Sequence, residues 1–64
     1  MLRKARFNKK LTQKDLAIYL GVSQSYISKL ETRKTKSISV AKILVLSSIL
    51  ELDPIKVFKF IAGL

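Results

Sequence analysis

The stretch TQKDLAIYLGVSQSYISKLE, residues 12–31, has the pattern of two short helices joined by one tight turn. Thr12 is a favourable first cap, because its hydroxyl can accept a hydrogen bond from a free N–H of the first turn. Asp15 follows at the spacing of a capping box. Gly21 lies at the expected C-terminal end of the first helix, where a left-handed backbone conformation favours glycine. Ser23 can then cap a second helix. The stretch therefore predicts a pair of helices around a glycine turn.

The apolar residues of this stretch recur at helical spacing, on one face of each helix. We expect the first helix over residues 13–20 and the second over residues 24–31. The polar side chains that point outward from the second helix are Gln24, Ser25, Ser28 and Lys29. Two helices, a turn with glycine and an outward polar face are typical of the DNA-binding helix-turn-helix. A purely structural helical hairpin is the alternative that periodicity alone leaves open.

The composition sets the class of the protein. The chain has 64 residues with only two Gly and one Pro, and alternating β-branched residues are absent. These features predict one all-α domain over residues 1–64. Without Cys or His, the chain has no disulfide, thiol nucleophile, zinc site of the usual kind or imidazole chemistry. We expect no cofactor and no metal.

The charge favours a polyanionic partner. Thirteen Lys and Arg stand against four Asp and Glu, for a net charge of +9. Nucleic acid is the first interpretation and an anionic membrane surface the second. A membrane-surface helix would segregate cations and apolar residues along its length, whereas here the apolar positions converge between helices. We therefore expect double-stranded DNA as the partner and no membrane.

Location and catalysis are also constrained. The longest apolar run, residues 43–46, is too short to span a bilayer, and no secretory signal follows the N-terminal cations. A chain without cysteine suits a reducing cytoplasm, which is the expected location. Asp15 and Asp53 are expected to be caps, and Glu31, as the family resemblance given below implies, is expected to form a structural ion pair. No pair of carboxylates then remains for acid–base catalysis, so we predict that the protein is not an enzyme.

Three more helices are expected, over residues 2–9, 40–51 and 54–62. The residues expected to face the core from them are Leu2, Ala5, Val40, Ile43, Leu44, Ser47, Leu50, Ile55 and Phe58. Phe7 fits none of these faces and is expected to be half-buried. Residues 32–37 are polar and predict a loop, which Ile38 closes by packing inward.

The last third of the chain carries more apolar residues than one small core can hide. A helix that is apolar on nearly all sides, as over residues 40–51, is typically buried on both sides. A second copy of the protein would cover the second side. The expected dimer or partner surface consists of Val45, Ile49, Phe60, Ile61 and Leu64. The alternative is that the helix at residues 54–62 folds over residues 40–51 and buries most of this surface.

The segment LTQKDLAIYLGVSQSYISKLE, residues 11–31, resembles the phage-repressor and Cro-like helix-turn-helix family, also called the XRE family. The resemblance extends backward to Arg6 and forward through VAKILVLSSILELDP, residues 40–54. It implies a compact, five-helix, lambda-repressor-like fold whose third helix enters the major groove. The chain departs from the family pattern at Arg33, where members usually carry Gly, and at Ile38, where they usually carry Pro.

The resemblance and the charge pattern together imply roles for individual residues. Arg6 is expected to pair with Glu31 and to tie the first helix to the end of the third. Base contacts are expected from Gln24, Ser25, Ser28 and Lys29. Phosphate contacts are expected from Gln13, Lys14, Tyr26, Arg33, Lys34 and Lys36. For the loop cations, a solvated surface without a DNA contact is the alternative.

The expected function is a sequence-specific transcriptional regulator that binds double-stranded DNA. Repression is the commoner outcome in the family that the chain resembles. Such regulators usually bind as dimers to two half-sites about one helical turn apart. The alternative is an antitoxin-type DNA-binding protein whose apolar C-terminal surface binds a partner protein. The sequence indicates no pocket for a small molecule.

Overall fold

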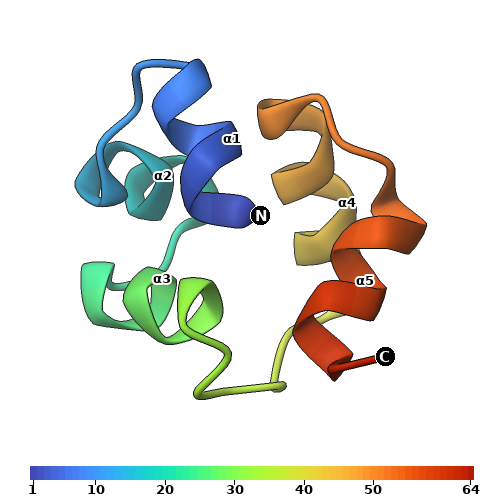
Figure 1. The fold of residues 1–64 in the computed structure, drawn as a ribbon. Helices are drawn as coiled ribbons and strands as arrows, with labels where there is room; N and C mark the ends of the chain where they lie inside the picture. Colours follow the sequence, from blue (N-terminus) through green and yellow to red (C-terminus); the bar gives the residue numbers. More distant parts are fainter.

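Five helices surround the core, and the computed structural model describes all of residues 1–64 (Figure 1). In chain order the helices are α1 (Leu2–Asn8), α2 (Gln13–Leu20), α3 (Gln24–Glu31), α4 (Val40–Leu50) and α5 (Pro54–Ala62). The predicted all-α fold with five helices is confirmed. The helices α1 and α4 each end one residue before the predicted end. None of the five is long and apolar enough to cross a membrane.

Side-chain caps set the starts of α2 to α5. The hydroxyl of Thr12 accepts a hydrogen bond from the Asp15 amide at 3.0 Å, and the Asp15 carboxylate accepts one from the Thr12 amide at 2.9 Å. These two bonds form the predicted capping box. They also lower the pKa of Asp15, and the hydrogen bond from the Thr12 backbone amide makes the largest contribution. Ser23, Ser39 and Asp53 cap the following three helices, each with a side-chain oxygen that accepts one backbone N–H and without the reciprocal bond.

Positive φ angles mark several chain reversals. Gly21 ends α2 with a φ of 69°, as the sequence predicts. Three residues other than glycine also have positive φ, namely Lys10, Arg33 and Glu51. Their Cβ atoms crowd the following carbonyl group, which makes this conformation unfavourable for L-residues. Arg33, at the position where members of the family that the chain resembles usually carry Gly, has a φ of 59°, a left-handed conformation that glycine adopts more easily.

The core takes one face from each helix. Its buried apolar residues are Leu2, Ala5, Leu16, Ala17, Leu20, Ile27, Leu30, Ile43, Leu46, Leu50, Val57 and Ile61. Ser47 is also buried, and its hydroxyl donates to the Ile43 carbonyl one turn earlier at 2.6 Å. Every buried side-chain nitrogen or oxygen atom has a hydrogen-bond partner. The buried polar side chains of this small domain are therefore satisfied.

The buried face of α4 differs from the expected one. Val40 and Leu44 were expected in the core but are exposed, whereas Leu46 lies in the core beside Ile43. Because α4 is apolar on nearly every side, its periodicity does not distinguish one face from another. The packing of α1, α2 and α5 against it selects the face that carries Leu46 and Leu50.

The helix α5 shows the same kind of difference. Ile55 and Phe58 were expected in the core but are exposed, and the buried residues are Val57 and Ile61. Both sets recur at helical spacing, so the sequence pattern alone could not choose between them. Phe7 in α1 was expected to be half-buried and is exposed.

Candidate nucleic-acid interface

The exposed side of α3 carries polar residues in one continuous sector. Gln24, Ser25 and Lys29 are exposed, and Ser28 is half-buried beside them. Residues at these spacings are neighbours on a helix surface, because one turn contains 3.6 residues. The opposite side of α3 is anchored in the core by Ile27. The structure therefore brings together the four residues expected to contact bases.

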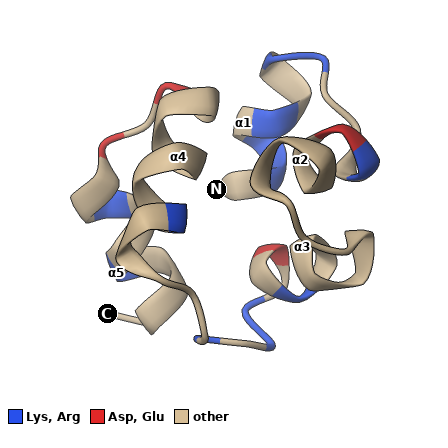
Figure 2. Ribbon diagram, turned by 180° about the vertical axis from the view of Figure 1, so that it is seen from behind, with Lys and Arg blue, Asp and Glu red and all other residues tan.

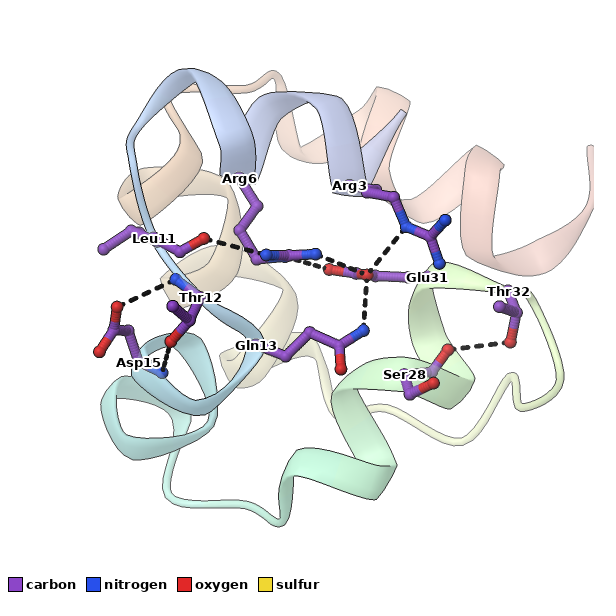
Figure 3. A network of polar contacts seen from close by, with 9 residues as sticks. All are labelled: Arg3, Arg6, Leu11, Thr12, Gln13, Asp15, Ser28, Glu31 and Thr32. Carbon is purple, nitrogen blue, oxygen red and sulfur yellow. Dashed lines mark hydrogen bonds and ion pairs between the residues drawn. The ribbon is translucent and has the colours of Figure 1, made fainter.

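A buried carboxylate holds the position of α3 (Figure 3). The Arg6 guanidinium donates to both oxygens of Glu31, from Nε to Oε2 at 2.6 Å and from Nη2 to Oε1 at 3.2 Å. Gln13 Nε2 donates to Glu31 Oε1 at 3.0 Å, and Arg3 Nε lies 3.6 Å from the same oxygen. Arg6 Nη1 also donates to the Leu11 carbonyl at 2.9 Å. This network joins α1, the start of α2 and the end of α3.

The network keeps Glu31 ionised. The side chains of Arg6 and Glu31 are only 6% and 1% exposed. Burial raises the pKa of Glu31, but the hydrogen bonds from Arg6 and Gln13, with the charges of Arg6 and Arg3, outweigh this effect. The pKa of Glu31 therefore lies below its ordinary value of 4.5. The expected pairing of Arg6 with Glu31 is present in the structure.

Arg3 also belongs to this network, a role that was not predicted from the sequence. Its position three residues before Arg6 places both guanidinium groups on neighbouring parts of the α1 surface. That spacing was the available signal. Gln13 is half-buried, and its contact with Glu31 uses one of the two N–H groups of its amide.

The loop between α3 and α4 is held by contacts within the chain. The Tyr26 hydroxyl donates to the Ser37 carbonyl, and burial raises the pKa of Tyr26. The Arg33 guanidinium lies 4.9 Å from the centre of the Phe60 ring on α5, within the range of a cation–π interaction. Tyr26 and Arg33, both expected to touch phosphate, therefore also position the loop.

An open groove of about 590 Å³ lies between α3 and the start of α4. The residues that line it are Val22, Tyr26, Lys36, Ser37, Ile38, Ser39 and Lys42. Figure 2 shows the cationic positions in the loop that leaves α3. Lys42 was not among the expected phosphate contacts. The available signal was its position three residues after Ser39, in the first turn of α4.

The remaining expected cations and apolar surface residues are distributed as follows. Lys14 and Lys34 are exposed. Of the expected dimer or partner surface, Val45 and Leu64 are exposed, whereas Ile49 and Phe60 are half-buried against the core. Ile61 is buried beside Val57 and cannot line a surface. Its assignment to the partner surface was wrong, because α5 folds onto α4 through the face that carries Ile61.

Two helices at a glycine turn, with a polar exposed face on the second, define a helix-turn-helix domain of the DNA-binding kind. The chain matches the helix-turn-helix family model over residues 2–57 and belongs to the Cro- and repressor-like XRE family of DNA-binding transcription regulators. This family is not typically enzymatic. No curated protein and no solved structure matches the chain significantly.

Proposed function

We propose that this protein is a sequence-specific repressor that reads the major groove of DNA with α3, as a dimer on an operator of two half-sites. The observation that carries the proposal is the exposed polar sector of α3, with Gln24 and Ser25 in its first turn. The Glu31 network supports it, because a reading helix must be held rigidly to present its side chains in one geometry.

Specificity would come from side chains at the start of α3. The Gln24 amide can donate to N7 of adenine and at the same time accept from its N6 amino group. No other base offers this pattern of hydrogen-bonding groups. Such a contact contributes about 1–3 kcal/mol of discrimination. The hydroxyls of Ser25 and Ser28 can donate or accept and so discriminate less. Lys29 would reach guanine or a phosphate.

Affinity would come mainly from the cations and helix termini around α3. The second amide N–H of Gln13 is available to a phosphate, and Lys14 stands exposed beside it. The groove with Lys36 and Lys42 lies at the N-terminus of α4, where free N–H groups and the helix dipole favour an anion. Lys34 and Arg33 extend the cationic surface along the loop, and Tyr26 holds that loop through Ser37.

The proposed activity contains no catalytic step. A dimer bound over a promoter represses by occupying the DNA, and the protein would act on the chromosome in the cytoplasm. The affinity should depend strongly on salt, because each neutralised phosphate releases counterions.

The test is selection of duplexes from a random library with the wild type and the Gln24→Ala variant. We expect the wild type to enrich two related half-sites, and Gln24→Ala to relax the preference at one position of each. Ser48→Ala is the control, because Ser48 is exposed on α4 and should leave the selected motif unchanged. Purely salt-dependent binding without an enriched motif would contradict sequence-specific recognition.

A second candidate function keeps DNA binding and adds a protein partner, as in an antitoxin. The observation that favours it is the set of exposed apolar side chains on α4 and α5. A toxin-like partner would bind there and leave α3 free. Pull-down with the intact domain and with surface variants of α4 separates this candidate from a simple repressor.

A further inference from the structure

The loop between α3 and α4, residues 32–39, carries two exposed cations between two points where it is held. The cations are Lys34 and Lys36, both expected to contact phosphate. After them, the loop is held by α3, because the Tyr26 hydroxyl donates to the Ser37 carbonyl. Before them, the loop has a separate contact, which comes from α5.

Arg33, at the start of the loop, makes this contact from an unfavourable backbone conformation. Its φ is 59°, and its amide donates to the Leu30 carbonyl at 3.2 Å. Glycine would adopt this turn without the steric cost. Glycine could not, however, supply the guanidinium, which lies 4.9 Å from the centre of the Phe60 ring, within the range of cation–π attraction. The arginine side chain therefore gives the turn a contact with α5 that glycine could not make.

The packing between the loop and α5 is otherwise incomplete. A cavity of about 90 Å³ lies between them, lined by Lys36 and Ile38 of the loop and by Phe58, Ile61 and Ala62 of α5. Atoms that face a gap lose dispersion contacts on that side, so such packing constrains the loop weakly. The position of the start of the loop therefore depends strongly on the contact between Arg33 and Phe60.

Phe60 is suited to hold the guanidinium in place. Its ring is half-buried and packs against the hydrophobic core, so the ring itself is fixed. A phenyl ring carries no hydrogen-bond donor and no charge for a phosphate. Phe60 also lies beyond residues 2–57, the part of the chain that the family shares. Any effect of Phe60 on DNA affinity would be indirect.

We propose that Phe60 is a positioning residue for DNA binding. It acts through Arg33 and holds the loop in the arrangement in which Lys34 and Lys36 meet the phosphates. The inference rests on the proposed function in one respect, because the loop must lie against DNA. A loop that is already ordered loses less conformational freedom on binding, so its cations contribute more affinity. Phe60 thereby strengthens binding without touching DNA.

Fluorescence anisotropy with a labelled, mixed-sequence duplex, at about 50 to 200 mM salt, measures the affinity and its salt dependence. Phe60→Leu keeps every charge and removes the ring. We expect it to weaken binding about three- to tenfold, the effect of one or two side chains that must be ordered on binding. Its log–log salt slope should equal that of the wild type, because the same cations reach the phosphates in the complex. Phe60→Tyr keeps the ring and should bind like the wild type.

Three further variants control for charge and folding. Lys34→Met removes a proposed phosphate contact and should reduce the salt slope by about one. Arg33→Met breaks the contact with Phe60 at an exposed position, outside the core. Adding Phe60→Leu to Arg33→Met should weaken binding by less than about twofold more, since one contact cannot be lost twice. Lys56→Met removes an exposed cation of α5 outside the loop and should leave the affinity nearly unchanged. Circular dichroism checks that each variant is folded.

Two results would overturn the positioning role. One is a folded Phe60→Leu variant that binds like the wild type, or a Phe60→Tyr variant that loses as much affinity as Phe60→Leu. The other is full additivity of Arg33→Met and Phe60→Leu, which would mean that the two residues act separately. These measurements use salt-dependent binding, which requires no selected motif. A wild type that selects no motif but shows the Phe60 effect would therefore contradict the repressor and support the positioning role.

Discussion

The two halves of this molecule share one apolar core but differ in their buried polar interactions. In the half made of α1, α2 and α3, a buried Glu31 carboxylate receives hydrogen bonds from Arg6 and Gln13. In the half made of α4 and α5, no buried charged side chain is present, and the contact between helices is apolar around Val57 and Ile61. The first half exposes a polar sector on α3, and the second exposes the apolar side chains of Val40, Leu44, Ile55 and Phe58.

This difference shows how polar and apolar contacts orient helices in different ways within one small chain. A polar network has directional bonds and orients α3 relative to α1 and α2. Apolar packing has little directional preference, so the sequence pattern of α4 and α5 does not fix which apolar face is buried, and the packing of the other helices selects it. The following experiments test whether the two halves differ in this way.

The largest effect is expected from Glu31→Ala. The substitution leaves the buried Arg6 guanidinium without its counter-charge, and the loss of one partner of a buried pair typically destabilises by about 3–5 kcal/mol. Urea unfolding followed by circular dichroism measures the free energy. The double variant Arg6→Met/Glu31→Leu should recover much of the loss, since neither charge is then buried alone. A loss below about 1 kcal/mol would mean that the network resembles an ordinary surface pair.

The pH dependence of stability should be traceable to the same carboxylate. Because the pKa of Glu31 is lower in the folded chain than its ordinary value of 4.5, the unfolded chain binds more protons between the two pKa values. The stabilisation is thus complete above about pH 4.5 and is lost as the pH falls through the lower, folded pKa. In the Glu31→Gln variant this part of the pH dependence should disappear. At acidic pH, where Glu31 of the wild type is protonated, the two proteins should have similar free energies of unfolding.

Asp15→Asn is the control for the pH experiment, because the pKa of Asp15 is also lowered but its carboxylate is part of an exposed cap. Wild type and both variants are unfolded with urea at several pH values between 3 and 7. If Glu31→Gln keeps the slope of the wild type below pH 4.5, another group titrates in its place.

The caps should contribute equally in the two halves. Thr12→Ala removes the cap of α2 and Ser39→Ala removes that of α4, and each should destabilise by about 1 kcal/mol. Thermal unfolding of the two variants measures the difference. Equal losses would assign the contrast between the halves to the Glu31 network. A much larger loss for Ser39→Ala would instead mean that α4 depends on its cap more than on apolar packing.

The smallest effect is expected from Glu51→Gln. Lys9 and Glu51 form an ion pair that joins the end of α1 to the end of α4, and the Glu51 side chain is 69% exposed. Exposed pairs contribute about 0–1 kcal/mol, and salt screens them. Urea unfolding at low and at high salt should show a difference only at low salt. A large, salt-independent loss would indicate that this contact positions the two halves relative to each other.

Much of the helix-turn-helix could be predicted from local chemistry. Thr12, Asp15 and Gly21 act within a few residues of themselves, so their roles follow from spacing. The buried faces of α4 and α5 could not be predicted, because Leu44 and Leu46, or Phe58 and Ile61, are equally apolar. Arg3 and Lys42 were not assigned, since their neighbours are brought to them by other helices.

The sequence by itself determined the helices, their caps, the glycine turn, the positive charge and the polar face of α3. These features depend on backbone geometry and on residues one turn apart, which short-range order settles. Only the tertiary structure decided that the Glu31 carboxylate contacts Arg6, Gln13 and Arg3 together. It also decided that Val57 and Ile61 are buried while Phe58 is exposed. Such choices depend on which helices meet, because apolar burial favours the arrangement that fills the whole core.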